Sequence, residues 1–179
     1  MVSLTIVFWM FVIIFAVIGA MRGWAKELLV TFALILSIFV LTLMDKFAPG
    51  LVKSLAKDGA ASLFWLRFAI TAGLVVFGYQ SVSIPRISAS PRLIRGSLQD
   101  TLLGLFIGVL NGFLIVGTIW YYLDETKYPL PFITAPVAGT EVGDAALKMI
   151  EYFAPAWLGT PAIYFAIAIA FGFVIVLFL

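Results

Sequence analysis

Long apolar segments constrain this chain more than any other feature, and the first of them runs from Val2 to Met21. Only Ser3 and Thr5 interrupt it with polar side chains. A helix of about 20 apolar residues rises roughly 30 Å, which is the thickness of the hydrocarbon core of a bilayer. No positive region precedes the segment and no small-x-small cleavage site follows it, unlike in a signal peptide. The segment therefore predicts a transmembrane helix.

Four further apolar segments follow along the chain. They are Leu28–Met44, Leu63–Ile84, Leu102–Leu123 and Ala162–Leu179. In the whole sequence 64% of residues are hydrophobic and 11% are charged, whereas a soluble domain averages about 25% charged residues. We therefore predict an all-α membrane protein with about five transmembrane helices.

The connections between these segments differ in length and chemistry. Residues 22–27 form a connection so short that the first two helices are expected to make a tight antiparallel hairpin. In the longest connection, Thr140 is expected to cap an interfacial amphipathic helix that runs to Phe153. We thus divide the chain into a four-helix membrane core (1–124), an external loop with the amphipathic helix (125–161) and a fifth transmembrane helix (162–179).

The distribution of charge predicts an orientation in the membrane. The first and third connections concentrate the basic residues Arg22, Lys26, Arg86, Arg92 and Arg95. Because connections on the cytoplasmic side carry the excess of Lys and Arg, the N-terminus is expected outside and the C-terminus inside. The three arginines of the third connection are also expected to contact anionic lipid headgroups. The net charge of only +2 makes nucleic acid an unexpected partner.

The residue content favours neither catalysis nor a bound cofactor. The chain contains no Cys and no His, which removes the commonest zinc ligands, haem ligand and general base. No Asp, Glu or Lys lies in the middle of an apolar segment, where an ion-coupled transporter usually needs one. Arg67 lies one turn inside the third segment and is expected to extend its guanidinium to the interface. We therefore expect no enzyme, no cofactor and no metal site.

Three glycines recur every fourth residue in the fourth segment, at Gly104, Gly108 and Gly112. Glycine inside a helix costs up to about 1 kcal/mol relative to alanine. In lipid, however, helices associate by close packing, which small residues on one face permit. This glycine stripe therefore predicts a close contact with the first or second helix, or with a second copy of the chain. Gly19 and Gly23 form a similar pair at the end of the first segment.

Several polar residues lie close to the glycine stripe in the predicted topology. Arg22, Lys26, Glu27 and Asp100 share one predicted membrane face. Asp100 fits either a residue that caps the fourth helix and suits its dipole, or an ion-pair partner of Arg22 or Lys26. Asn111 is the only amide in the middle of an apolar segment. It needs a hydrogen bond across a helix interface, unless it lines a polar pathway.

Two stretches of sequence resemble the bacterial colicin V production protein family, the CvpA family. "RGWAKELL" (22–29) is similar to the family pattern R-G-x-x-[RK]-E-x-L, and "DTLLGLFIGVLNGFLIV" (100–116) to D-x-x-x-G-x-x-x-G-x-x-x-G. The resemblance covers Val2–Asp124. It departs from the family at Asn111, where a basic residue is frequent, and in the chain beyond residue 124. The matching motif positions are Arg22, Gly23, Glu27, Asp100, Gly104, Gly108 and Gly112.

The resemblance implies a multi-pass protein of the bacterial inner membrane that is linked to toxin production or export and to envelope homeostasis. It carries over no catalytic residue. We expect a non-enzymatic scaffold or a channel-like component, whose partners are the lipid bilayer and other membrane subunits or further copies of itself. Two alternatives stay open. The chain could be an accessory subunit of an energy-transducing complex, docking through its fifth helix, or a small-solute transporter, which a water-accessible Asn111 would favour.

Overall fold

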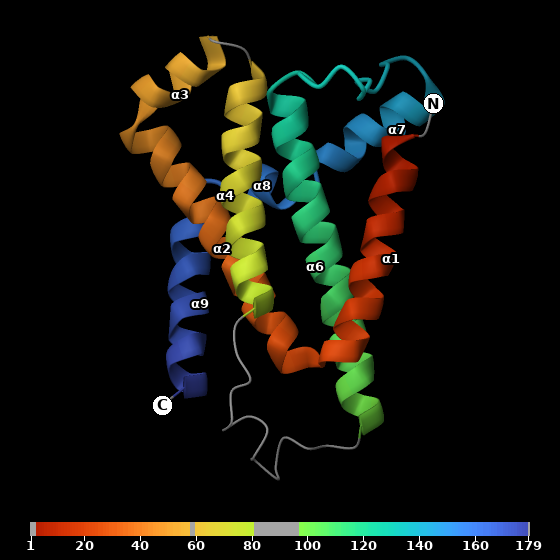
Figure 1. Cartoon of the computed structure of the whole chain (residues 1–179), viewed down its shortest axis with the longest axis vertical. Coiled ribbons are helices and arrows are strands. Elements are labelled where there is room, and N and C mark those ends of the chain that lie inside the picture. The colour runs from red at the N-terminus through yellow and green to blue at the C-terminus, as the bar shows by residue number, and fades with distance from the viewer. Residues whose placement is uncertain (1–2, 58–59, 81–96, 179) are drawn as a thin grey trace.

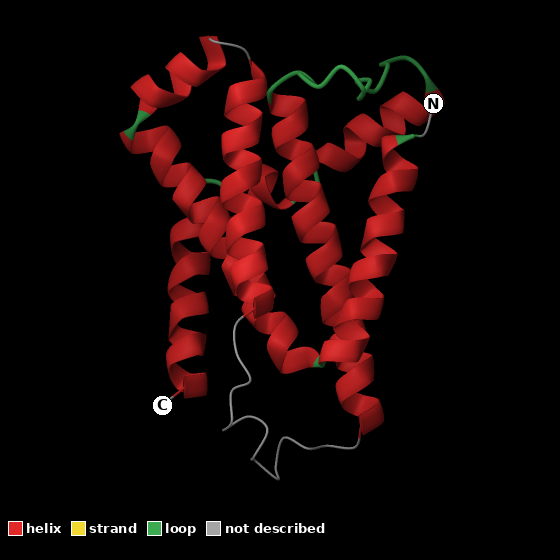
Figure 2. Ribbon diagram, viewed as in Figure 1, coloured by secondary structure: helices red, strands yellow, loops and turns green. Residues whose placement is uncertain are grey.

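The computed structural model describes residues 3–57, 60–80 and 97–178, and every regular element among them is a helix (Figures 1 and 2). In chain order the helices are α1 (Leu4–Arg22), α2 (Trp24–Phe47), α3 (Pro49–Lys57), α4 (Ala60–Gln80), α6 (Ser97–Glu125), α7 (Glu141–Ile150), α8 (Ala154–Trp157) and α9 (Ala162–Phe178). Within the described ranges α1, α2, α4 and α6 are long and apolar enough to cross a membrane, and α9 is a shorter apolar helix. The prediction of an all-α membrane protein is confirmed.

The helices run between two ends of a bundle in which α6 is central (Figure 1). At one end, which we call the Gly23 end, α1 turns into α2, α6 begins, and α4 and α9 finish. The opposite end, the α3 end, holds the start of α1, the short helix α3 and the finish of α6. Four residues were expected to share one membrane face, and all four lie in helix ends at the Gly23 end: Arg22 finishes α1, Lys26 and Glu27 lie in the first turn of α2, and Asp100 lies in the first turn of α6.

The expected hairpin of the first two helices is wrong. Their connection is a single residue, Gly23, at a φ of 84° that side-chain-bearing residues rarely adopt. Beyond this turn the two helices diverge (Figure 1). Helix α1 packs along α6, while α2 packs along α4, α6 and α9. Helix α1 makes its close contact with α6, and this contact replaces the expected pairing of α1 with α2.

The last part of the segment that joins α6 to α9 packs into the bundle, while the assignment of this segment to the outer side of the membrane stays a prediction. Its helix α7 begins as predicted, with the Thr140 hydroxyl accepting from the Gly143 amide at 3.1 Å, but finishes at Ile150. Phe153 follows, is fully buried, and packs with ring centroids 5.4 Å from Phe8 and 5.5 Å from Trp120. Apolar side chains thus draw this segment out of the interface and into the core.

Helix α8 lies well inside the bundle, at a distance from the α3 end where α6 finishes (Figure 1). Ala154 and Leu158, at its two ends, share one apolar cluster with Leu34 of α2 and Ile115 of α6. Ile115 stands about 15 Å along α6 from its finish at Glu125, at 1.5 Å per residue. Non-helical backbone at such depth is tolerated in membranes only where protein covers it. The burial of Ala154 and Leu158 meets that condition.

Candidate functional site

Helices α1 and α6 approach each other through glycines on both sides. A Cβ atom added to Gly19 would collide with the carbonyl oxygen of Gly104 and would lie 2.7 Å from the Cα of Gly108. A Cβ atom added to Gly108 would lie 2.5 Å from the carbonyl oxygen of Phe15, and one added to Gly112 would lie 2.9 Å from the Phe15 Cβ. Of the alternatives drawn from the sequence, the glycine stripe therefore contacts the first helix of the same chain.

Gly23 and Asp100 meet where this interface reaches the Gly23 end. The carboxylate oxygen Oδ1 of Asp100 accepts a hydrogen bond from the backbone amide of Trp24, the first residue of α2, at 3.3 Å. A Cβ on Gly23 would stand 2.6 Å from the other carboxylate oxygen, so a larger residue would displace it. Asp100 thus holds the start of α2, where a negative charge also suits the helix dipole.

Of the two alternatives for Asp100, the ion pair is not observed. Within the described part of the chain, neither Arg22 nor Lys26 pairs with Asp100, because Arg22 turns to Glu27 instead. Asp100 does lie in the first turn of α6, as the capping alternative requires. The backbone amide of Trp24, and not a cation, is the partner of its carboxylate on the neighbouring helix.

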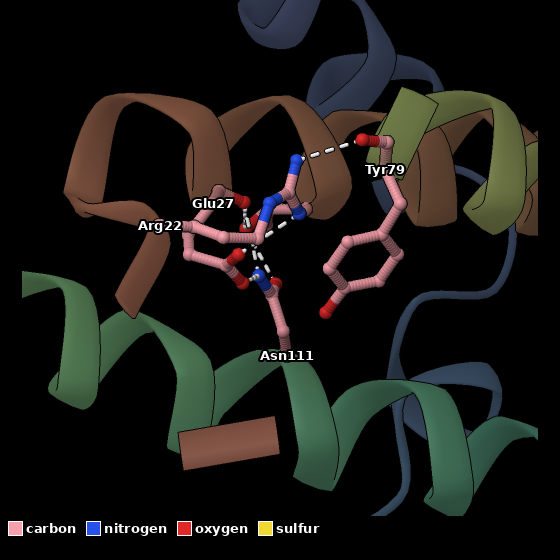
Figure 3. A network of polar contacts seen from close by, with 5 residues as sticks. Arg22, Glu27, Tyr79 and Asn111 are labelled. Atoms are coloured by element: carbon pink, nitrogen blue, oxygen red, sulfur yellow. Dashed lines mark hydrogen bonds and ion pairs between the residues drawn. The ribbon is translucent and has the colours of Figure 1, made fainter. Parts of the chain in front are cut away.

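Glu27 is the centre of a buried polar network, although it lies near a membrane end (Figure 3). Its side chain is 0% exposed, and its Oε1 accepts from Arg22 Nη1 at 3.1 Å. The amide of Asn111 donates to Glu27 Oε2 and to the Glu27 carbonyl oxygen, at 2.9 Å each. The hydroxyl of Thr31 donates to Asn111 Oδ1 at 2.7 Å. Asn111 is itself 0% exposed, with both its amide nitrogen and its oxygen bonded.

Arg22 extends this network to a fourth helix. Its Nη2 donates to the carbonyl oxygen of Tyr79, in the last turn of α4, at 2.8 Å. Its guanidinium carbon stands 4.4 Å from the centre of the Tyr79 ring, within the range of a cation–π contact. We call Arg22, Glu27, Thr31, Tyr79 and Asn111 the Glu27 network. It connects α1, α2, α4 and α6 at the Gly23 end, while Lys26 stays exposed outside it.

Arg67 forms a second buried cluster, near the α3 end. The expectation that it extends to the interface is wrong, because its side chain is only 2% exposed. Its Nη1 lies 2.7 Å from Glu125 Oε2 and its Nη2 lies 3.1 Å from Asp45 Oδ1. These carboxylates finish α6 and α2, so the guanidinium joins three helices. The signal was in the sequence: a cation inside an apolar segment is costly, and acids finish two neighbouring segments.

Outside the membrane-spanning helices, Tyr128 is the one group of the described residues with a resolved titration shift. Burial raises the pKa of Tyr128 to about 12, and the hydrogen bond from Trp120 opposes part of this rise. The Trp120 indole donates that bond to the Tyr128 hydroxyl at 3.0 Å. The pair fixes the start of the segment that leads toward α7.

The remaining residues singled out by the sequence give no further site. Arg86, Arg92 and Arg95 lie outside the described residues, so their contact with lipid headgroups stays a prediction. Among the residues that are described, no three His, Cys, Asp or Glu side chains stand close enough to hold a metal ion. Both polar clusters connect helices.

A comparison with known families reaches the same part of the chain. Residues 4–134 match the family model described as Colicin V production protein. The match contains α1, α2, α4, α6, the glycine contact and both polar clusters, and finishes before α7. No curated protein and no solved structure matches the chain. Because the family match covers more than half of its length, the chain belongs to the colicin V production protein family.

Proposed function

We propose that this protein is a non-enzymatic scaffold of the bacterial inner membrane, which supports toxin production or export, or envelope homeostasis, by holding other membrane proteins. The observation that carries the proposal is the closure of the Glu27 network. Its carboxylate and the Asn111 amide bond to groups on neighbouring helices and are completely buried. Polar groups arranged in this way fix the helices relative to one another and serve as structural connections.

The same observation weakens the transporter alternative. A solute pathway needs polar side chains that face water, and Asn111 was the amide that could have lined one. Instead it is enclosed between α2 and α6, and the neighbouring α1–α6 contact is so close that no added Cβ would fit at Gly108. A rigid body of helices supports the scaffold function better than a solute pathway does.

We place the Gly23 end on the cytoplasmic side. Arg22 and Lys26 lie there, and the C-terminal helix α9 finishes at that end (Figure 1). The excess of basic residues on cytoplasmic connections supports this orientation. The start of α1 and the helix α3 would then lie on the outer side.

An accessory subunit of an energy-transducing membrane complex is a second candidate, and helix α9 favours it. One face of α9 packs on α2, whereas Phe165, Ile169 and Val176 are between 69% and 80% exposed on the other. A Cβ added to Gly172 on this helix would meet nothing within 4 Å. Helix α9 also lies outside the family match, so it is an addition to the family core. Its open face would take a helix of another subunit.

Purification in a mild detergent, with mass measurement and identification of bound proteins, tests both candidates. A scaffold or subunit retains a protein partner in fixed stoichiometry, and the identity of that partner separates the two. Gly172→Leu should release a partner that docks on α9. Gly73→Leu is the matched control, because a Cβ on Gly73 of α4 also meets nothing within 4 Å.

Thiol labelling provides the opposing test. The chain has no native cysteine, so Asn111→Cys and Thr31→Cys introduce single reactive groups at the Glu27 network. Both should resist a charged thiol reagent, while Lys53→Cys on the exposed helix α3 should react. A lone chain without bound protein, together with rapid labelling at residue 111, would overturn the scaffold and favour a transporter.

A further inference from the structure

A narrow apolar groove runs along α2 between α4 and α9, on the side of the bundle where these three helices lie together (Figure 1). Leu29, Ala33 and Leu36 of α2 form its floor, and the rings of Phe77 of α4 and Phe171 of α9 stand on its two sides. Among the described residues, no charged or hydroxyl-bearing side chain lines it. The groove encloses about 230 Å³.

The dimensions of the groove favour a thin occupant. Its floor residues recur at the spacing of one helix face, so from Leu29 to Leu36 the groove is roughly 10 Å long at 1.5 Å per residue. A helix segment of that length is at least about 10 Å wide and occupies roughly 800 Å³, which is more than three times the volume of the groove. A partner helix would not enter, but a single hydrocarbon chain would.

A cation of the described residues stands at one end of the groove. Lys26 lies three residues before Leu29 on α2 and therefore on the same face, with about 5–6 Å between their Cβ atoms. Its side chain is exposed, and no carboxylate among the described residues pairs with it. Lys26 belongs to the first turn of α2, at the Gly23 end, where the apolar span gives way to the membrane surface. A positive charge thus stands where the groove meets the headgroup layer.

We propose that this groove binds one acyl chain of an anionic phospholipid, whose phosphate headgroup pairs with Lys26. The apolar floor and rings contact the chain, and the lysine selects the headgroup. The site is independent of the proposed scaffold function, since it lies on the face of α2 that turns away from the Glu27 network and needs no protein partner.

Native mass spectrometry of the full chain tests this site. The protein is reconstituted into vesicles with equal parts of phosphatidylglycerol and phosphatidylcholine, extracted in mild detergent, and its retained lipids are counted. The wild type should retain phosphatidylglycerol several-fold over phosphatidylcholine. Lys26→Gln should lower this preference several-fold, while Lys53→Gln, which removes an exposed lysine of α3, should keep it.

A second pair of variants tests the groove itself. Val174→Trp places an indole at a residue that lines it, and Val76→Trp places one at an exposed residue of α4 that does not. Only Val174→Trp should lose the retained lipid, with both variants monodisperse. Equal retention of the two lipids by the wild type would overturn the proposal. So would retention that Val174→Trp leaves unchanged, or a protein found in the groove in place of lipid.

Discussion

The contact between α1 and α6 makes a prediction whose sign depends on the structure. Alanine is favoured over glycine in a helix interior by about 1 kcal/mol. At Gly108, however, the added Cβ would stand 2.5 Å from the carbonyl oxygen of Phe15 and 3.0 Å from the Cα of Gly19. Ordinary contact begins near 3.4 Å, so α1 must move away from α6 by almost 1 Å. Both obstacles are backbone atoms and cannot rotate aside.

The magnitude of Gly108→Ala follows from these two opposing effects. Overpacking of this kind costs about 1–3 kcal/mol. The gain in helix propensity offsets about 1 kcal/mol of it, which leaves a net loss of about 1 kcal/mol in the free energy of unfolding. Gly73→Ala in α4 meets no atom within 4 Å, so there the propensity gain stands alone. The two variants should differ by about 2 kcal/mol and in opposite directions from the wild type.

Reversible unfolding of the purified protein in mixed detergent micelles, followed by circular dichroism, measures this difference. Gly108→Leu serves as a larger step at the same position and should destabilise further. If Gly108→Ala is as stable as Gly73→Ala, the α1–α6 contact is not as close as described. The assignment of the glycine stripe to a contact within one chain would then be refuted.

Three further predictions concern the buried polar groups. Glu27→Ala removes the acceptor of a buried arginine and a buried amide, so it should lower the free energy of unfolding by about 3–5 kcal/mol; a loss below about 1 kcal/mol would contradict the Glu27 network. Arg67→Met should cost less than about 1 kcal/mol, because Asp45 and Glu125 are nearly half exposed and rehydrate, whereas removing both carboxylates strands the buried guanidinium and should cost about 3 kcal/mol or more. Stability should fall as the pH rises from 10 toward 12, since the folded state holds the Tyr128 proton more tightly than the unfolded chain; Tyr128→Phe should flatten this fall, and an unchanged slope would contradict it.

The sequence by itself determined the apolar helices of this membrane protein. The expected segment Val2–Met21 corresponds to α1, and the later apolar segments correspond to α2, α4, α6 and α9. Hydrocarbon thickness acts on each segment separately, so a local count of apolar residues suffices. The spacing of the glycines likewise predicted a close helix contact, because spacing fixes which residues share one face.

Only the tertiary structure decided which groups meet. The sequence pattern placed Glu27 in a connection. In the structure α2 begins at Trp24, so the Glu27 carboxylate lies inside a helix and faces Asn111. The sequence pattern placed Phe153 in an external loop. In the structure the Phe153 ring fills the space beside Gly117 of α6, where an added Cβ would stand 2.5 Å from this ring. Such pairings join residues far apart in the chain. They depend on where the intervening helices place the backbone, which local pattern does not encode.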